Sequence, residues 1–259
     1  PKKGEKALDD GYALTAPVSP KQLLEKMVQG DEAYERVRLI EGWTFRQLRS
    51  ALSQAPHLVP ATRDWSDTRL MEALGQGGVS PEGRFFPDTY AYSRGVSDIT
   101  VLRRAHAAMR ARLGAVWAER APDLPLKTAD EALILASIVE KETGRPGDRG
   151  RIAGVFANRL RIGMPLQTDP TVIYGLGVSF DGNLRKRDLQ ADGPYNTYTR
   201  AGLPPTPIAM PGMAALRAAV RPDPTRALYF VARGDGSSVF SEDLASHNRA
   251  VNTYQRNRP

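Results

Sequence analysis

The sequence predicts an α+β protein with a small N-terminal β-α-β-α region followed by a larger mixed α+β domain. Short strand and helix patterns alternate in residues 1–55, and several apolar patterns with helical period follow. A hairpin pattern lies near the C-terminus. We therefore expect an accessory region at 1–55 and a second domain at 56–259, whose core is formed by residues 128–259.

The N-terminal region contains two candidate strands and two helix starts. Residues 11–15 fit a short strand, and Ser19 followed by Pro20 predicts a helix. Residues 37–40 (VRLI) are the second candidate strand. Residues 44–47 (TFRQ) have the capping-box form, in which a Thr and a Gln three positions later satisfy each other's backbone N–H groups. A second helix is therefore expected to begin here.

Residues 81–90 (PEGRFFPDTY) combine three aromatic rings with two carboxylates and an arginine. The rings could stack on sugar faces while the polar groups bond hydroxyls. Alternatively, the rings anchor the loop to the hydrophobic core, and the local pattern alone favours this second interpretation. Helices are expected on either side, at 68–74 and at 98–119.

The most informative stretch is a helix expected from residue 128 to residue 143. It begins with a second capping-box pattern at Thr128 and Glu131, contains the longest apolar run of the chain, and ends in Glu140 and Glu142. At about 100° per residue, Glu140 continues the apolar face, and Glu142 points elsewhere. Burial and the negative end of the helix dipole should raise the pKa of Glu140, as a general acid requires. The alternative is a helix end where both glutamates reach solvent.

Further elements follow toward the C-terminus. A helix is expected at 152–163, and Thr168 or Asp169 can cap another helix with Pro170 in its first turn. Residues 195–198 (YNTY) form a polar and aromatic loop. Residues 228–232 and 237–240 read as a β-hairpin, and a last helix is expected at 243–254. His247 in that helix has no partner at metal spacing, which favours a structural role.

Composition limits the classes of function. The 36 basic and 29 acidic residues give a net charge of +7, which suits an acidic polymer but is weak support on its own. There are no cysteines, so disulfides and thiolate chemistry are excluded. No nucleotide-binding loop or zinc motif is present, and the arginines are scattered among acids. We therefore expect no cofactor, no metal and no nucleic-acid partner.

Several of these stretches together resemble the signature of one family. The helix end ASIVEKET (136–143) is followed, in order, by RLRIGM (159–164), LQTDPTVIYG (166–175), YNTY (195–198), GLPP (202–205) and LASHN (244–248), and EGRFFPDTY (82–90) precedes it. This pattern resembles the endolytic murein transglycosylases, the YceG-like family. The resemblance covers nearly the whole chain.

The resemblance implies a function and a location. It implies non-hydrolytic cleavage of nascent peptidoglycan at the MurNAc–GlcNAc bond, which leaves a 1,6-anhydro-MurNAc end and terminates strand elongation. Residues 1–55 would then be a truncated LysM-like part, and 56–259 the catalytic domain. The resemblance also implies an N-terminal anchor, absent from this sequence, in the bacterial inner membrane, with the catalytic domain in the periplasm or outside the membrane. Peptidoglycan synthases are the expected protein partners.

Glu140 is the expected catalytic residue, as a single general acid and base. An internal hydroxyl replaces the water of a hydrolase, so a second carboxylate is not required. Two alternatives remain: a hydrolytic muramidase with Asp169 as the second carboxylate, and a non-catalytic peptidoglycan-binding scaffold. The expected substrate-binding residues are Glu142, Gln167, Thr168, Asp169, Tyr195, Asn196 and Tyr198.

Overall fold

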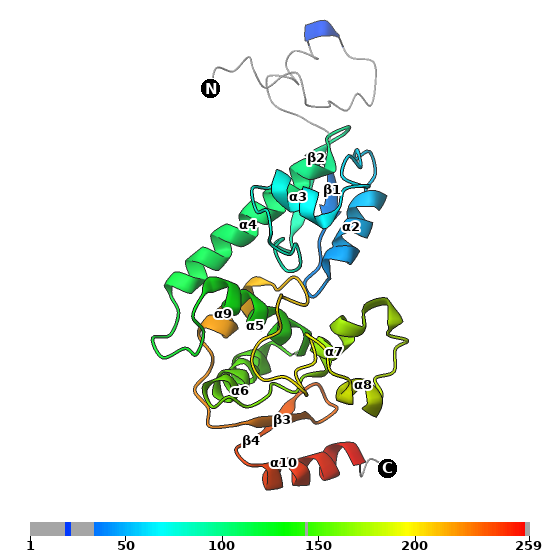
Figure 1. The fold of residues 1–259 in the computed structure, drawn as a ribbon. Helices are drawn as coiled ribbons and strands as arrows, with labels where there is room; N and C mark the ends of the chain where they lie inside the picture. Colours follow the sequence, from blue (N-terminus) through cyan, green and yellow to red (C-terminus); the bar gives the residue numbers. More distant parts are fainter. Residues whose placement is uncertain (1–18, 22–33, 143–144, 257–259) are drawn as a thin grey trace.

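The computed structural model describes residues 19–21, 34–142 and 145–256 (Figure 1). Within these residues, helices surround two small antiparallel sheets of two strands each, which confirms the predicted α+β class. The strand predicted at 11–15, and the helix predicted from Ser19 beyond residue 21, lie outside the described residues. No helix in the described part of the chain is long and apolar enough to span a membrane.

One end of the molecule is built around the first sheet. Strand β1 (Tyr34–Arg38) pairs antiparallel with β2 (Thr89–Ser93), and helices α2 (Phe45–Gln54) and α3 (Asp67–Ala73) lie beside them (Figure 1). The predicted capping box at Thr44 and Gln47 is present at the start of α2. The buried side chains of this end form one hydrophobic cluster that includes Val37, Leu48, Leu52, Leu70, Phe85, Tyr92 and Leu102. This cluster continues across residue 55, where a domain boundary remains a prediction.

Helix α4 (Asp98–Ala118) connects the two ends of the protein. Its first half contributes Val101 and Leu102 to the first cluster, and its second half contributes Met109 and Leu113 to another. The second cluster surrounds α5 (Ala129–Glu142), which packs against α9 (Met213–Val220), α6 (Arg149–Arg161), α4 and α7 (Asp169–Leu176). Helix α5 therefore lies at the centre of the larger half (Figure 1).

The predicted apolar run forms the buried part of α5, where Leu133, Leu135 and Ile138 are fully buried. At the start of the helix, the Thr128 hydroxyl accepts from the Glu131 N–H as expected. The Glu131 carboxylate, however, accepts from the N–H of Lys127, one residue further from the helix than the capping-box pattern predicts. The Ser137 hydroxyl accepts from the Ile208 N–H, which ties a distant loop to the helix.

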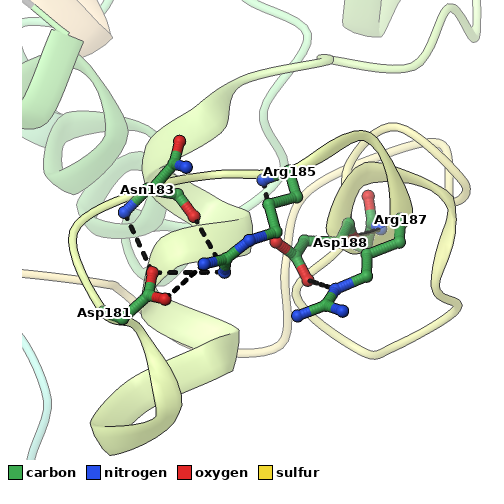
Figure 2. A network of polar contacts seen from close by, with 6 residues as sticks. Asp181, Asn183, Arg185, Arg187 and Asp188 are labelled. Carbon is green, nitrogen blue, oxygen red and sulfur yellow. Dashed lines mark hydrogen bonds and ion pairs between the residues drawn. The ribbon is translucent and has the colours of Figure 1, made fainter.

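The segment after α7 is held by exposed polar contacts. It contains a 3₁₀ turn (Gly177–Ser179) and the short helix α8 (Lys186–Gln190). Between them, Arg185 forms an ion pair with Asp181 at 2.5 Å, and its backbone N–H donates to Asp188 at 2.8 Å (Figure 2). These contacts fix a loop that contributes few buried apolar side chains.

The C-terminal end confirms the predicted hairpin and helix. Strands β3 (Tyr229–Ala232) and β4 (Ser238–Ser241) pair antiparallel, and α10 (Leu244–Val251) follows with Asp243 as its N-cap (Figure 1). A π-helical turn (Asn252–Arg256) extends α10. The His247 ring stacks on Tyr229 with 5.1 Å between ring centroids, which fits the structural role predicted for it.

Candidate active site

Glu140 points from α5 toward the N-terminal end of α9. Its carboxylate accepts a 2.9 Å hydrogen bond from the backbone N–H of Gly212, the N-cap residue of α9. Arg149 approaches the other oxygen at 3.8 Å, and the Glu140 side chain is 8% exposed. Burial raises its pKa, the Glu41 carboxylate raises it further, and the Gly212 N–H, Arg149 and Lys141 counteract this rise. These counteracting groups stabilise the anion, as does the positive end of the α9 dipole.

Glu142 lies in a different environment, as expected for two glutamates that do not share a helix face. Its carboxylate accepts a hydrogen bond from the Thr168 hydroxyl. Burial raises the pKa of Glu142, the nearby Asp169 carboxylate raises it further, and the bond from Thr168 lowers it. The neighbours that shift this pKa are therefore a neutral hydroxyl and a like charge. Such an environment favours the protonated carboxylic acid.

Two of the predicted motifs meet beside Glu142. The N–H of Thr168 donates to the Thr197 hydroxyl at 3.1 Å, and the N–H of Gln167 donates to the Thr197 carbonyl at 3.0 Å. The Tyr198 hydroxyl donates to Asp169 at 2.5 Å. The loop before α7 and the 195–198 loop thus form one surface next to Glu142.

Gln167 has an unusual backbone conformation in this surface. Its φ angle is +50°, in the left-handed region that non-glycine residues rarely adopt. Arg159 of α6 holds the loop by donating to the carbonyls of Pro165 and Leu166 and to the Gln167 side chain at 3.3 Å. Strained residues that are held by their surroundings are concentrated at functional sites.

The contacts of Tyr195 and Asn196 favour a structural role for both residues. The Asn196 side chain is buried, and its amide donates to the carbonyls of Asp188, Leu189 and Ala191. Its oxygen accepts from the Tyr198 N–H at 2.9 Å. These bonds occupy the groups with which Asn196 was expected to hold substrate, so its position favours a role in shaping the loop. The Tyr195 hydroxyl bonds Thr206 at 2.8 Å, and its ring faces a cavity.

That cavity has a volume of about 1010 Å³ and separates α2 from α7. Its wall reaches the end of α5 through Lys141 and the start of α7 through Pro170. Glu82 also lines it and accepts from the Phe45 N–H at 2.9 Å and from the Tyr174 hydroxyl at 3.1 Å. Burial is the main reason that the pKa of Glu82 rises to about 7. The 81–90 aromatics do not line this cavity, because Phe85, Phe86 and Tyr90 are buried in the core.

Comparison with known proteins identifies the family of this fold and site. The YceG-like family matches residues 2–253, which is almost the whole chain. The chain belongs to the YceG-like family. A crystal structure of a yceG-like protein from Listeria monocytogenes is similar to this YceG-like chain, with a TM-score of 0.69 and 31% sequence identity over 92% of this chain and 83% of that one.

Two curated relatives of this YceG-like chain are named endolytic murein transglycosylase. The protein from Bacillus subtilis (strain 168) is 31% identical, and the match covers 94% of this chain and 72% of the relative. The protein from Streptococcus pneumoniae (strain D39) is 33% identical over 66% of this chain, and the matched part spans 31% of the relative.

The structure therefore separates Glu140 from several of the other predicted site residues of this YceG-like chain. One group gathers at Glu142 and consists of Gln167, Thr168, Asp169 and Tyr198. Glu140 instead contacts Gly212 and Arg149. Sequence reasoning did not single out Arg159, and it noted Glu82 only within its motif. In the described part of the chain, no three acidic or histidine side chains are arranged to bind a metal ion.

Proposed function

We propose that this chain is an endolytic murein transglycosylase that cuts glycan strands at the MurNAc–GlcNAc bond without water. Membership of the YceG-like family and the names of its relatives support this proposal. The observation that carries it in the structure is a buried, cation-poor carboxyl, Glu142, beside the predicted sugar-binding residues. A site of this kind can hold a proton near neutral pH and present it to a glycosidic oxygen.

Either glutamate at the end of α5 can supply the single acid and base. The sequence pattern favours Glu140, whose pKa is also raised. The contacts favour Glu142, because its neighbours are a neutral hydroxyl and a carboxylate, whereas two cations, Arg149 and Lys141, lower the pKa of Glu140 against the effect of Glu41. The gathering of Gln167, Thr168 and Tyr198 around Glu142 is a second reason. We therefore propose Glu142 as the catalytic acid. An experiment that tests this role must also show that Glu140 is not the catalytic acid.

The reaction needs one proton to leave the acid and one to return. The protonated carboxyl donates to the glycosidic oxygen as the bond from C1 of MurNAc to that oxygen breaks. The resulting carboxylate then takes the proton of the MurNAc 6-hydroxyl as that oxygen bonds C1. The 1,6-anhydro ring closes without water, so proximity of the internal hydroxyl replaces a second carboxylate.

Digestion of purified sacculi tests this function. Mass spectrometry of the soluble products should find fragments that end in anhydro-MurNAc, each one water lighter than a reducing end. Release of reducing ends would contradict the transglycosylase proposal. Binding to sacculi without soluble products would indicate the non-catalytic scaffold instead.

A hydrolytic muramidase is the second candidate, and one observation favours it. Asp169 is close enough to Glu142 to raise its pKa, so the two carboxyl groups could divide the acid and base roles. Asp169 accepts a hydrogen bond from Tyr198, which fixes the position of the carboxyl group. Product mass separates the two reactions, and Asp169→Asn should abolish only a hydrolytic one.

We also propose that the enzyme terminates nascent strands at the outer face of the bacterial inner membrane, next to peptidoglycan synthases. Endolytic cleavage is the chemistry that limits strand length, and the relatives named for it support this role. Adding the chain to a synthase reaction should shorten the glycan products and add anhydro ends. Unchanged product length would contradict the proposed termination role.

A further inference from the structure

The cavity between α2 and α7 has a wall of mixed charge. Three cationic side chains, Arg46, Arg49 and Lys141, and two carboxyl groups, Asp67 and Glu82, line it. Its volume of about 1010 Å³ lies at the upper end of the range for ligand sites, roughly 300–1,000 Å³. A neutral glycan offers no ionic partner to any of these five groups. The wall therefore suits a ligand that carries charges of both signs.

Several of these charges have no ionic partner within the protein. In the part of the chain that the structure describes, no hydrogen bond or ion pair involves the exposed Arg46 side chain, and the buried Nη1 of Arg49 has no hydrogen-bond partner. The Glu82 carboxyl accepts from two neutral groups, the Phe45 N–H and the Tyr174 hydroxyl. Charges that a protein leaves unpaired in a cavity wall are available to a ligand.

Two residues that line the cavity are direct chain neighbours of candidate active-site residues. Lys141, which lines it, lies between Glu140 and Glu142 in the chain. Pro170, which also lines it, directly follows Asp169. A substituent on a sugar bound at the end of α5 can therefore reach the cavity. Aromatic residues also line the wall and can provide apolar contacts for such a substituent, namely Phe45, Trp65, Tyr174, Phe180 and Tyr195.

We propose that this cavity binds the stem peptide attached to the muramic acid unit, so that the enzyme prefers peptide-bearing strands to bare glycan. The proposal rests on the proposed function. In an amide-linked muramic acid unit the sugar is neutral, whereas the stem peptide carries free carboxylates and, before cross-linking, a free amine. Arg46 and Lys141 pair with the carboxylates, and Asp67 and Glu82 with the amine.

Binding of a muramyl pentapeptide tests this proposal without any cleavage, because the compound has no glycosidic bond. The 259-residue chain should bind it, and Arg46→Glu should weaken binding at least about tenfold by replacing a charge-assisted pair with a repulsion. Glutamate in the first turn of α2 suits the helix dipole, so this variant should fold. Arg103→Glu makes an identical charge change on the exposed face of α4 and should bind like the wild type. No binding by the wild type, or equal binding by both variants, would overturn the proposal.

Cleavage supplies a second readout. The ratio of kcat/KM for peptide-bearing over peptide-free strands should be about ten or more for the wild type and for Arg103→Glu, and close to one for Arg46→Glu. A wild-type ratio of one would overturn the proposal, and so would an Arg46→Glu variant that keeps the wild-type ratio. A chain that binds the pentapeptide but cleaves neither strand would contradict the proposed function and leave the peptide site supported.

Discussion

Two glutamates that are separated by one residue on α5 meet different neighbours. Glu140 faces the N-terminal end of α9 and the cation of Arg149, which favour the anion against the nearby Glu41 carboxylate. Glu142 faces the Thr168 hydroxyl and the Asp169 carboxylate, which lie on the loop expected to contact sugar. Burial raises both pKa values, yet the first environment fits a structural link between α5 and α9, and the second fits an acid.

This difference shows that a raised pKa alone does not identify a catalytic residue. Both carboxyls are desolvated because α5 lies within the hydrophobic core of the larger half. What separates them is the identity of the neighbours beyond the helix, which come from residues 41, 149 and 212 for Glu140 and from 168 and 169 for Glu142. Mutations can separate the two environments.

The largest effect is expected from Glu142→Gln, which should fold normally and lose activity by a factor of about 10² or more, because the amide cannot donate and recover the proton. Release of anhydro-muropeptides from sacculi measures this loss. The matched control is Glu140→Gln, which should lose less than about tenfold. If Glu140→Gln loses more activity than Glu142→Gln, the catalytic acid is Glu140, the residue that the sequence pattern favours.

Glu82 extends the comparison to a third buried carboxyl. Its pKa is about 7 in the folded protein and near 4.5 when unfolded, so the folded state binds the proton more tightly. The contribution of Glu82 to stability is thus greatest below pH 4.5 and falls as the pH rises to about 7, by about 3 kcal/mol at most. Urea unfolding should give the wild type a lower free energy of unfolding at pH 8 than at pH 5. This difference should be smaller in Glu82→Gln. A pH dependence that is identical in the variant would contradict the assignment.

Glu140→Ala tests the structural side of the comparison. Removing the carboxylate leaves the Gly212 N–H without its acceptor and Arg149 without its counter-charge in a nearly buried position. We expect a loss of about 1–3 kcal/mol in the free energy of unfolding, measured by chemical denaturation. Glu140→Gln retains an oxygen acceptor and should lose less. Stability equal to the wild type in both variants would mean that Glu140 does not link α5 to α9.

The smallest effect is expected from Thr168→Val, which removes the hydrogen bond to Glu142 and retains the side-chain volume. Because this bond lowers the pKa of Glu142, its loss should raise that pKa. The acid works when protonated, so kcat falls as the pH rises through its pKa, and this alkaline limb should move to higher pH in the variant. Thr168→Ser, which keeps the hydroxyl, should retain the wild-type profile. If the alkaline limb of the pH profile is not shifted in Thr168→Val, Thr168 does not influence the pKa of the catalytic acid.

Local patterns predicted most of the elements but not their partners. The caps at Thr44 and Thr128 and the C-terminal hairpin depend on neighbouring residues, so the sequence was sufficient to predict them. The pairing of β1 with β2 joins segments about fifty residues apart, and no local pattern encodes it. Helix α9 was not predicted either: it has only eight residues and directly follows a stretch rich in proline.

The candidate site was predictable in its parts, because its motifs lie in contiguous stretches of the chain. The way in which these motifs come together in three dimensions was not predictable. The helix geometry correctly separated Glu140 from Glu142, but it could not show which of them meets the loop that contains Thr168, since that contact spans 26 residues. The 81–90 aromatics illustrate the same limit: burial in the core, the interpretation that the local pattern favoured, is observed, while Glu82 of that segment lines the cavity.

The central claim is that an internal hydroxyl, and not water, attacks C1 while one carboxyl moves a single proton out and back. The most direct measurement is digestion of peptidoglycan in water enriched in the heavy oxygen isotope, followed by mass spectrometry of the new glycan ends. Our account predicts anhydro ends that contain no heavy oxygen. Reducing ends that each carry one heavy oxygen atom would contradict it.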